Sequence, residues 1–161
     1  MTEKDQLVRA IEREFPTTLK VLRAYPAAKS ELKPSPKSKT ARELAHAFVF
    51  DAKACDMTLD GGLEIEKMPA LGPTFADVVA TYEDLQGAFV ARLKRTPDQD
   101  LNTTVKFYAG PKRMEDMRKM DVLWFMLMDT VHHRGQMSVY LRLADAKVPS
   151  IYGPSADEPW R

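Results

Sequence analysis

Hydrophobic side chains recur every three or four residues over four long segments of the chain, which is the spacing of an α-helix with one buried face. These segments span residues 2–25, 40–57, 74–95 and 113–144. The third shows the pattern most clearly, with apolar or aromatic residues at Phe75, Val78, Val79, Tyr82, Leu85, Phe89 and Leu93. Four amphipathic helices in one small chain can bury their apolar faces only against one another, so the pattern predicts a four-helix bundle.

Residues that favour helix ends mark the boundaries of these segments. Thr40 is followed three residues later by Glu43, which predicts a capping box at the start of the second helix. Thr74, directly after Pro73, is the expected N-cap of the third. Pro16 lies inside the first segment, which predicts either a kink or a short lead-in followed by a helix whose first turn contains Pro16.

Between the third and fourth segments, the stretch LNTTVKFYAG alternates β-branched or aromatic residues with polar ones. This alternation predicts a short extended segment from Thr103 to Tyr108. The predicted fold class is therefore all-α, a four-helix bundle with a short extended segment before the last helix. The chain of 161 residues is expected to form one domain over residues 1–161.

Composition narrows the range of partners. The 24 basic and 23 acidic residues give a net charge of +1, which argues against nucleic acid or an acidic membrane as a partner. The longest apolar run, Val122–Met128, is far shorter than the ~20 residues of a membrane span. Cys55 is the single cysteine, and the charged N-terminus lacks the apolar region of a secretory signal. We therefore expect a cytoplasmic protein.

The fourth segment contains polar residues where a core helix should continue. At ~100° per residue, Asp129 and His133 lie only ~40° apart, on the apolar stripe that includes Met126 and Met137. Burying a carboxylate and an imidazole without partners would cost several kcal/mol, roughly the stability margin of a small domain. Another group must therefore compensate them.

Two explanations follow from the residues. Asp129 and His133 could hydrogen-bond each other across one helical turn, or lie at a wet edge of the bundle. Alternatively, they could share a divalent metal, because ligands at positions i and i+4 of a helix reach one coordination sphere. A third ligand would then come from elsewhere, and His46 is the only histidine outside this segment. A single histidine on an apolar face is more often a satisfied core residue, so both explanations remain open.

Several stretches resemble one family of proteins. The block HHRGQMSVYLRL, the following KVPSIYGPSADE, the upstream FPTTLKVLRAYP and SPKSKTARELAHAF, and the segment VKFYAG resemble the DinB-like family of small helical bacterial proteins related to YfiT. The resemblance covers nearly the whole chain. It implies an up-down-down-up four-helix bundle with a long connection between the second and third helices.

The resemblance also implies a divalent metal, nickel or zinc, held by one histidine of the second helix and an HxxxH pair of the last. His46 matches the first ligand and His133 the third, while Asp129 stands where the family pattern has histidine. Aspartate ligates zinc, nickel, iron or manganese through oxygen, and three ligands with open positions are typical of a catalytic metal.

The remainder of the motif carries structural expectations. Gly135 costs ~1 kcal/mol in a helix interior, which predicts close packing of another helix. Arg134 is expected to pair with a neighbouring helix, and Gln136 to donate to a metal-bound group or line a pocket. Cys55 is expected to be a small buried hydrophobic residue. His132 points ~100° away from His133 and is not expected to bind the same ion.

The family resemblance implies two chemistries, metal-dependent hydrolysis of a small molecule, or transfer involving a low-molecular-weight thiol such as bacillithiol or mycothiol. The alternative is a non-catalytic, stress-related protein that binds a metal or an apolar ligand. Because the run Val122–Met128 is apolar on every side of a helix, we also expect a homodimer.

Overall fold

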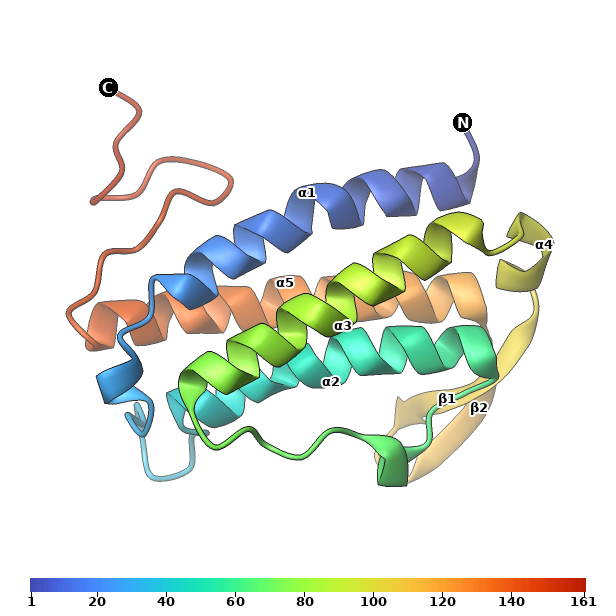
Figure 1. The fold of residues 1–161 in the computed structure, drawn as a ribbon, viewed down its shortest axis with the longest axis horizontal. Helices are drawn as coiled ribbons and strands as arrows, with labels where there is room; N and C mark the ends of the chain where they lie inside the picture. The colour runs from blue at the N-terminus through green and yellow to red at the C-terminus, as the bar shows by residue number, and fades with distance from the viewer.

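Four long helices dominate the computed structural model, which describes residues 1–161 (Figure 1). They are α1 (Glu3–Arg23), α2 (Ala41–Asp60), α3 (Phe75–Arg95) and α5 (Lys119–Leu143). The shorter elements are the helix α4 (Asp98–Leu101), the strands β1 (Thr104–Gly110) and β2 (Arg113–Arg118), and the 3₁₀ turns at Ala27–Lys29 and Ile65–Lys67. The predicted four-helix bundle is confirmed. No helix is both long enough and apolar enough to cross a membrane.

Ion pairs between helices define the directions of α1, α3 and α5. Arg23 near the end of α1 pairs with Glu83 early in α3 at 2.5 Å, while Glu12 of α1 pairs with Lys94 near the end of α3 at 2.5 Å. These two helices are therefore antiparallel. Arg118, at the start of α5, pairs with Glu3 at 2.9 Å, so α5 begins beside the start of α1 and runs parallel to it.

Helices α2 and α3 run parallel to each other. Near their starts, Arg42 donates to the carbonyl of Gly72 at 2.9 Å, and near their ends Arg92 pairs with Asp56 at 2.9 Å. The connection between them, residues 61–74, therefore returns along the whole bundle (Figure 1). The order of directions is up, down, down, up.

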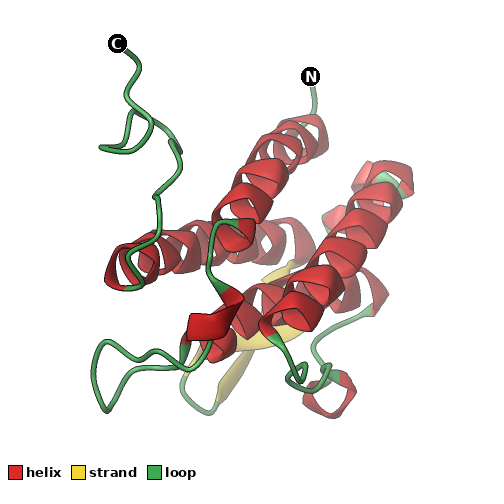
Figure 2. Ribbon diagram, turned by 60° about the vertical axis from the view of Figure 1, so that its left-hand side comes forward, coloured by secondary structure: helices red, strands yellow, loops and turns green.

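The predicted extended segment is confirmed, but the expectation that the last helix begins near Arg113 is wrong. Residues Arg113–Arg118 form β2, which pairs antiparallel with β1 from Thr104↔Arg118 to Gly110↔Arg113. A lone strand leaves its backbone donors and acceptors unpaired, and the second strand satisfies them. The fold is consequently not purely all-α, because this two-stranded sheet lies beside the bundle (Figure 2).

The predicted helix starts are confirmed. Thr40 and Thr74 each accept a hydrogen bond from the backbone of the residue three positions on, completing capping boxes with Glu43 and Asp77. Helix α1 continues unbroken through Pro16, so the alternative of a lead-in followed by a new helix is wrong.

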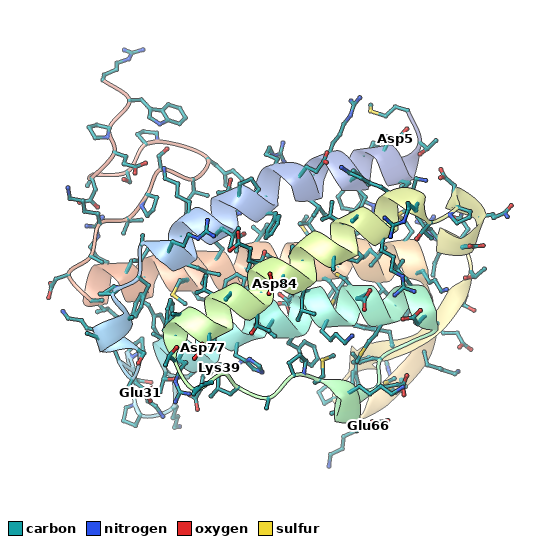
Figure 3. All side chains as sticks on the ribbon, viewed as in Figure 1. Asp5, Glu31, Lys39, Glu66, Asp77 and Asp84 are labelled. Atoms are coloured by element: carbon teal, nitrogen blue, oxygen red, sulfur yellow. The ribbon has the colours of Figure 1, made fainter.

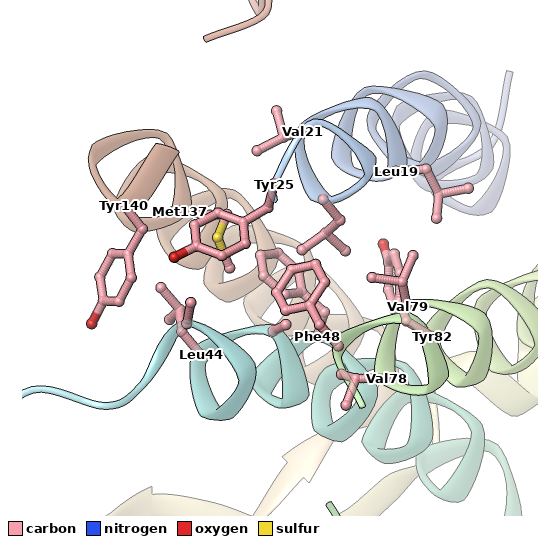
Figure 4. Packing of buried hydrophobic residues seen from close by; sticks show 14 of the residues in the cluster. Leu19, Val21, Tyr25, Leu44, Phe48, Val78, Val79, Tyr82, Met137 and Tyr140 are labelled. Carbon is pink, nitrogen blue, oxygen red and sulfur yellow. The ribbon is translucent and has the colours of Figure 1, made fainter. Parts of the chain in front are cut away.

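Two apolar clusters fill the bundle, one toward each end. The first contains Tyr25, Phe48, Tyr82 and Met137, contributed by the four long helices and the residues after α1 (Figure 4). The second gathers Leu7, Phe89, Phe107 and Leu123 near the hairpin, among others. Each long helix has a buried polar residue near the level where the two clusters meet: Glu14 in α1, Asp51 in α2, Gln86 in α3 and Arg134 in α5. The bundle thus has a polar layer at mid-height.

Candidate metal site

Three potential metal ligands converge where α2 and α5 pack together at this polar layer. One ligand atom each from Asp51, Asp129 and His133 lies within 4.8 Å of the other two. Asp51 comes from the middle of α2, whereas Asp129 and His133 lie one turn apart on α5. The helical spacing brings the two α5 residues to one face, as the sequence predicted, and the packing of α2 adds a second carboxylate.

Asp51 is buried and incompletely hydrogen-bonded. Its Oδ2 accepts a hydrogen bond from the Thr130 hydroxyl at 3.1 Å, but its Oδ1 has no hydrogen-bond partner. Burial, and then the nearby Asp129 carboxylate, raise the pKa of Asp51 well above its usual range. An acidic oxygen in such surroundings is costly unless a positive charge compensates it.

His133 is oriented by a neighbouring side chain on α5. Its Nδ1 lies 3.0 Å from Oε1 of Gln136, and its Nε2 lies 3.5 Å from Oδ2 of Asp129. The amide oxygen of Gln136 can only accept, so this contact requires a proton on Nδ1, and a neutral ring with that proton presents the lone pair of Nε2 to the carboxylates. This is the arrangement by which proteins fix a metal-binding histidine.

The donor set fits a divalent cation. Two carboxylates and one imidazole supply the oxygen and nitrogen ligands that zinc, nickel, iron and manganese accept. A cation among them would compensate the repulsion between Asp51 and Asp129 and provide a partner for the orphaned Oδ1. Asp51 also borders an internal void of about 10 Å³, roughly the space of one water molecule, which is the competing way to satisfy that oxygen.

His46 does not belong to this group of three. It precedes Asp51 by five residues, which places the two side chains ~140° apart around α2. Burial lowers the pKa of His46, and a hydrogen bond with the backbone of Pro69 in the α2–α3 connection partly opposes that shift. The proposed ligation by His46 therefore stays a prediction, while the structure offers Asp51 as the partner from α2.

The sequence pattern did contain an indication of Asp51. It is the only acidic residue between Glu43 and Asp56, and it follows the run AHAFVF. The same argument that singled out Asp129, a carboxylate within an apolar helix, applies to Asp51.

The structure also tests the predicted structural roles of Arg134, Gly135, His132 and Cys55. Arg134 pairs with Glu14 of α1 at 2.6 Å, which confirms its interhelical role. Cys55 is buried, as expected. A Cβ atom added at Gly135 would meet no atom within 4 Å, so close packing of another helix of this chain is wrong. His132 is exposed and lies outside the ligand group.

Two open cavities flank the three ligands. One, of about 400 Å³, has both polar and apolar walls and includes His133, Gln136, Tyr140 and the unpaired, exposed Lys39. Lys39 precedes α2 at the end of the bundle remote from the hairpin (Figure 3). The other, of about 560 Å³, has mainly apolar walls and includes Asp129. Solvent and small molecules can therefore approach the α5 ligands from both sides.

Comparison with known proteins places this architecture in one group. The model of the DinB family matches residues 1–160. YrdA of Bacillus subtilis, an uncharacterized protein, is 33% identical over 104 residues, and this match spans 64% of the present chain and 58% of YrdA.

Solved structures share the fold at low sequence identity. A DinB-like protein of Bacillus cereus superimposes with a TM-score of 0.78 at 23% identity, covering 92% of this chain and 97% of that one. YjoA of Bacillus subtilis gives 0.73 at 15% identity, covering 91% and 96%. YfiT of Bacillus subtilis, described as a probable metal-dependent hydrolase with an unusual four-helix bundle topology, gives 0.68 at 14% identity, covering 89% of each chain. With a family model matched along essentially its whole length, this chain belongs to the DinB family.

Proposed function

We propose that this protein is a divalent-metal-dependent hydrolase of a small molecule, with Asp51, Asp129 and His133 as the metal ligands. The observation that carries the proposal is the buried Oδ1 of Asp51, which has no hydrogen-bond partner and belongs to a residue clustered with a second carboxylate and an imidazole. The description of YfiT, a structural neighbour, as a probable metal-dependent hydrolase supports the same chemistry.

The side chains around the ligands have separate tasks. When bound, a divalent cation supplies Lewis acidity, which lowers the pKa of water and polarises a carbonyl group. Thr130 holds one oxygen of Asp51, and Gln136 holds the ring of His133. Asp51 is fully enclosed whereas Asp129 is one-third exposed, so a substrate would approach from the α5 side.

Transfer to or from a low-molecular-weight thiol is the second candidate. The cavity beside His133 contains Lys39, an exposed cation without an ion-pair partner. Such a cation would attract a carboxylate of a thiol of the bacillithiol or mycothiol type. Either reaction uses the same three ligands.

Metal analysis of the untagged protein tests the site directly. We expect close to one equivalent of nickel, zinc, iron or manganese in the wild type, and loss of that metal in Asp51→Asn, Asp129→Asn and His133→Gln. His132→Gln is the matched control, because His132 neighbours His133 but lies outside the ligand group. His46→Gln tests the ligand implied by the family resemblance. Full metal content in Asp51→Asn with loss in His46→Gln would replace Asp51 by His46.

Activity assays then separate the reactions. A panel of ester and amide substrates is compared with an electrophile supplied together with bacillithiol or mycothiol, before and after removal of metal by a chelator. Hydrolysis that is lost on chelation and restored by metal supports the proposal. Stoichiometric metal without turnover in either assay would favour the non-catalytic binding protein.

A further inference from the structure

A groove of about 560 Å³ lies between the hairpin, α5, the middle of α2 and the start of the connection that follows α2. Its walls come from four separate parts of the chain, and they are formed by Phe50, Leu63, Phe107, Tyr108, Ala109, Gly110, Met117, Phe125, Met126 and Asp129. A volume of this size falls within the range of pockets that bind small molecules.

The walls of the groove are apolar or aromatic except at Asp129. Asp129 is the only charged residue among them, and the remaining side chains are aromatic, aliphatic or thioether groups. Phe125 is 52% exposed and Tyr108 is 43% exposed, although both are large and hydrophobic. Phe125 packs edge-to-face against the buried Phe107, with ring centroids 6.5 Å apart, so one of its edges is anchored to the hairpin.

The groove is continuous with the candidate metal site. Asp129 belongs both to its wall and to the ligand group, and Met126, also in the wall, precedes it by about one helical turn. A ligand whose polar centre is held beside Asp129 would therefore place any attached group of moderate size against Phe125 and Met126.

The hairpin is shaped for this contact. Its pairing register shifts between Tyr108 and Gly110, which leaves Ala109 as an extra residue in the strand that faces the groove. Such bulges bend a strand and are frequent beside binding sites. A Cβ atom added at Gly110 would meet no atom within 4 Å, so this side of the groove is open.

We propose that this groove binds an uncharged apolar group of the substrate, aromatic or branched aliphatic, while the reacting centre of that substrate lies at Asp129, Asp51 and His133. The inference rests on the proposed function, because the metal site defines which end of the ligand is polar. It deepens that function by assigning a substrate class, esters or amides that carry one bulky apolar substituent.

Methionine methyl groups allow a direct binding test on the intact protein. Met117 and Met126 line the groove, whereas Met128 is 55% exposed and lies outside it. The metal-loaded protein carrying [¹³C-methyl]methionine is titrated with a hydroxamate series of increasing alkyl or aryl size, and the metal-free protein with 4-fluorotoluene, which has no metal-binding head. We expect both probes to shift the Met117 and Met126 resonances and to leave Met128 unchanged.

Variants with matched exposure test the role of the wall. In the wild type, hydroxamate affinity should increase roughly fourfold for each methylene group that the groove buries. Phe125→Ala removes an exposed wall residue and should flatten this dependence on size. Met128→Ala removes an equally exposed residue of the same helix that does not line the groove, and it should keep the dependence.

The outcomes separate this inference from the proposed function. Shifts at Met117 and Met126 with 4-fluorotoluene, together with a wild type that binds no divalent metal when metal is added, would support the groove and refute the metal-dependent reaction. Hydroxamate binding that requires metal but is independent of tail size, with both resonances unmoved, would overturn the groove and retain the metal site. Shifts of the groove resonances that depend only on protein concentration would assign the groove to a second copy of the chain and overturn the inference.

Discussion

Arg134 of α5 donates from Nη2 to Oε2 of Glu14 in α1 at 2.6 Å, inside the polar layer of the bundle. The same guanidinium donates to the Thr18 hydroxyl at 3.2 Å and to the hydroxyl of Tyr152, whose ring lies 5.0 Å from it. Tyr152 in turn donates to Glu14 at 2.7 Å. This network joins the first helix, the last helix and the C-terminal segment next to the candidate metal site.

Removing either half of this ion pair should destabilise the protein strongly. Arg134→Met leaves the Glu14 charge buried without its partner, and we expect a loss of about 3–5 kcal/mol in the free energy of unfolding. The double variant Glu14→Met/Arg134→Met should recover most of that loss, since neither charge remains buried. Urea denaturation of the single and double variants measures the difference, and purely additive losses would contradict the coupling.

The pair also predicts a dependence of stability on pH. Burial raises the pKa of Glu14, but the hydrogen bonds donated by Tyr152, Arg134 and Arg13, together with the charge of Arg134, outweigh it and hold the pKa below its ordinary value of 4.5. The stabilisation is therefore complete above that value and is lost as the pH falls through the lowered pKa. We expect the Tm difference between wild type and Glu14→Gln to be constant near neutral pH and to shrink below about pH 4.5. A difference that stays constant to pH 3 would refute this assignment.

Asp51 should have opposite effects with and without metal. In the metal-free protein its buried charge is unfavourable, so Asp51→Asn should be at least as stable as the wild type. With metal at about one hundred times its Kd, the wild type should gain about 2.7 kcal/mol and the variant almost nothing. Thermal denaturation in the presence of a chelator measures the stability difference between the two metal-free proteins, and denaturation with added metal measures how much metal stabilises each of them. Equal stabilisation of the two proteins by metal would remove Asp51 from the site.

Gln136 is expected to act as a positioning residue for His133. Gln136→Leu removes the acceptor for Nδ1, and we expect metal affinity to fall about 10- to 100-fold. Because Gln136 is exposed, the stability of the metal-free protein should change little. Gln136→Glu keeps an acceptor at the same place and should restore binding. Unchanged affinity in Gln136→Leu would show that the contact does not orient the ring.

The outer face of α5 predicts self-association. Met128, Val139 and Leu143, none of which lines the groove, are exposed at helical spacing along it, with open space at Gly135 between them. We expect a homodimer that covers this face, and Val139→Glu should shift the protein toward monomer in sedimentation experiments. A wild type that stays monomeric at high concentration would contradict the expectation.

The sequence was sufficient for the helices but not for every element between them. Capping residues and apolar spacing mark three helix starts closely, because these local features determine where a helix can begin. The segment Arg113–Arg118 forms a strand instead of the first turns of the last helix, since its charged residues have no helical preference that outweighs pairing with β1. The directions in which the helices run do not follow from the apolar spacing either. An apolar stripe on a helix can pack against the same neighbours whether the helix runs up or down the bundle.

The candidate site was predictable along one helix and not between helices. Asp129 and His133 come together by the geometry of α5 alone, so the sequence could place them. Which residue of α2 joins them depends on how α2 is rotated about its axis, and packing settles that rotation. It brings Asp51 to α5 and His46 toward the α2–α3 connection.

The parallel arrangement of α1 and α5 has a consequence for how the protein folds during synthesis. Glu14 and Arg134 are 120 residues apart in the chain, and Asp129 and His133 lie on the same helix as Arg134, which is synthesised long after α1 and α2. Until α5 emerges, the nascent chain has an unpaired buried acid in α1 and a single buried carboxylate in α2, at the places where the folded bundle has an ion pair and the three candidate ligands. Closure of the bundle and assembly of the candidate metal site therefore both wait for the synthesis of α5.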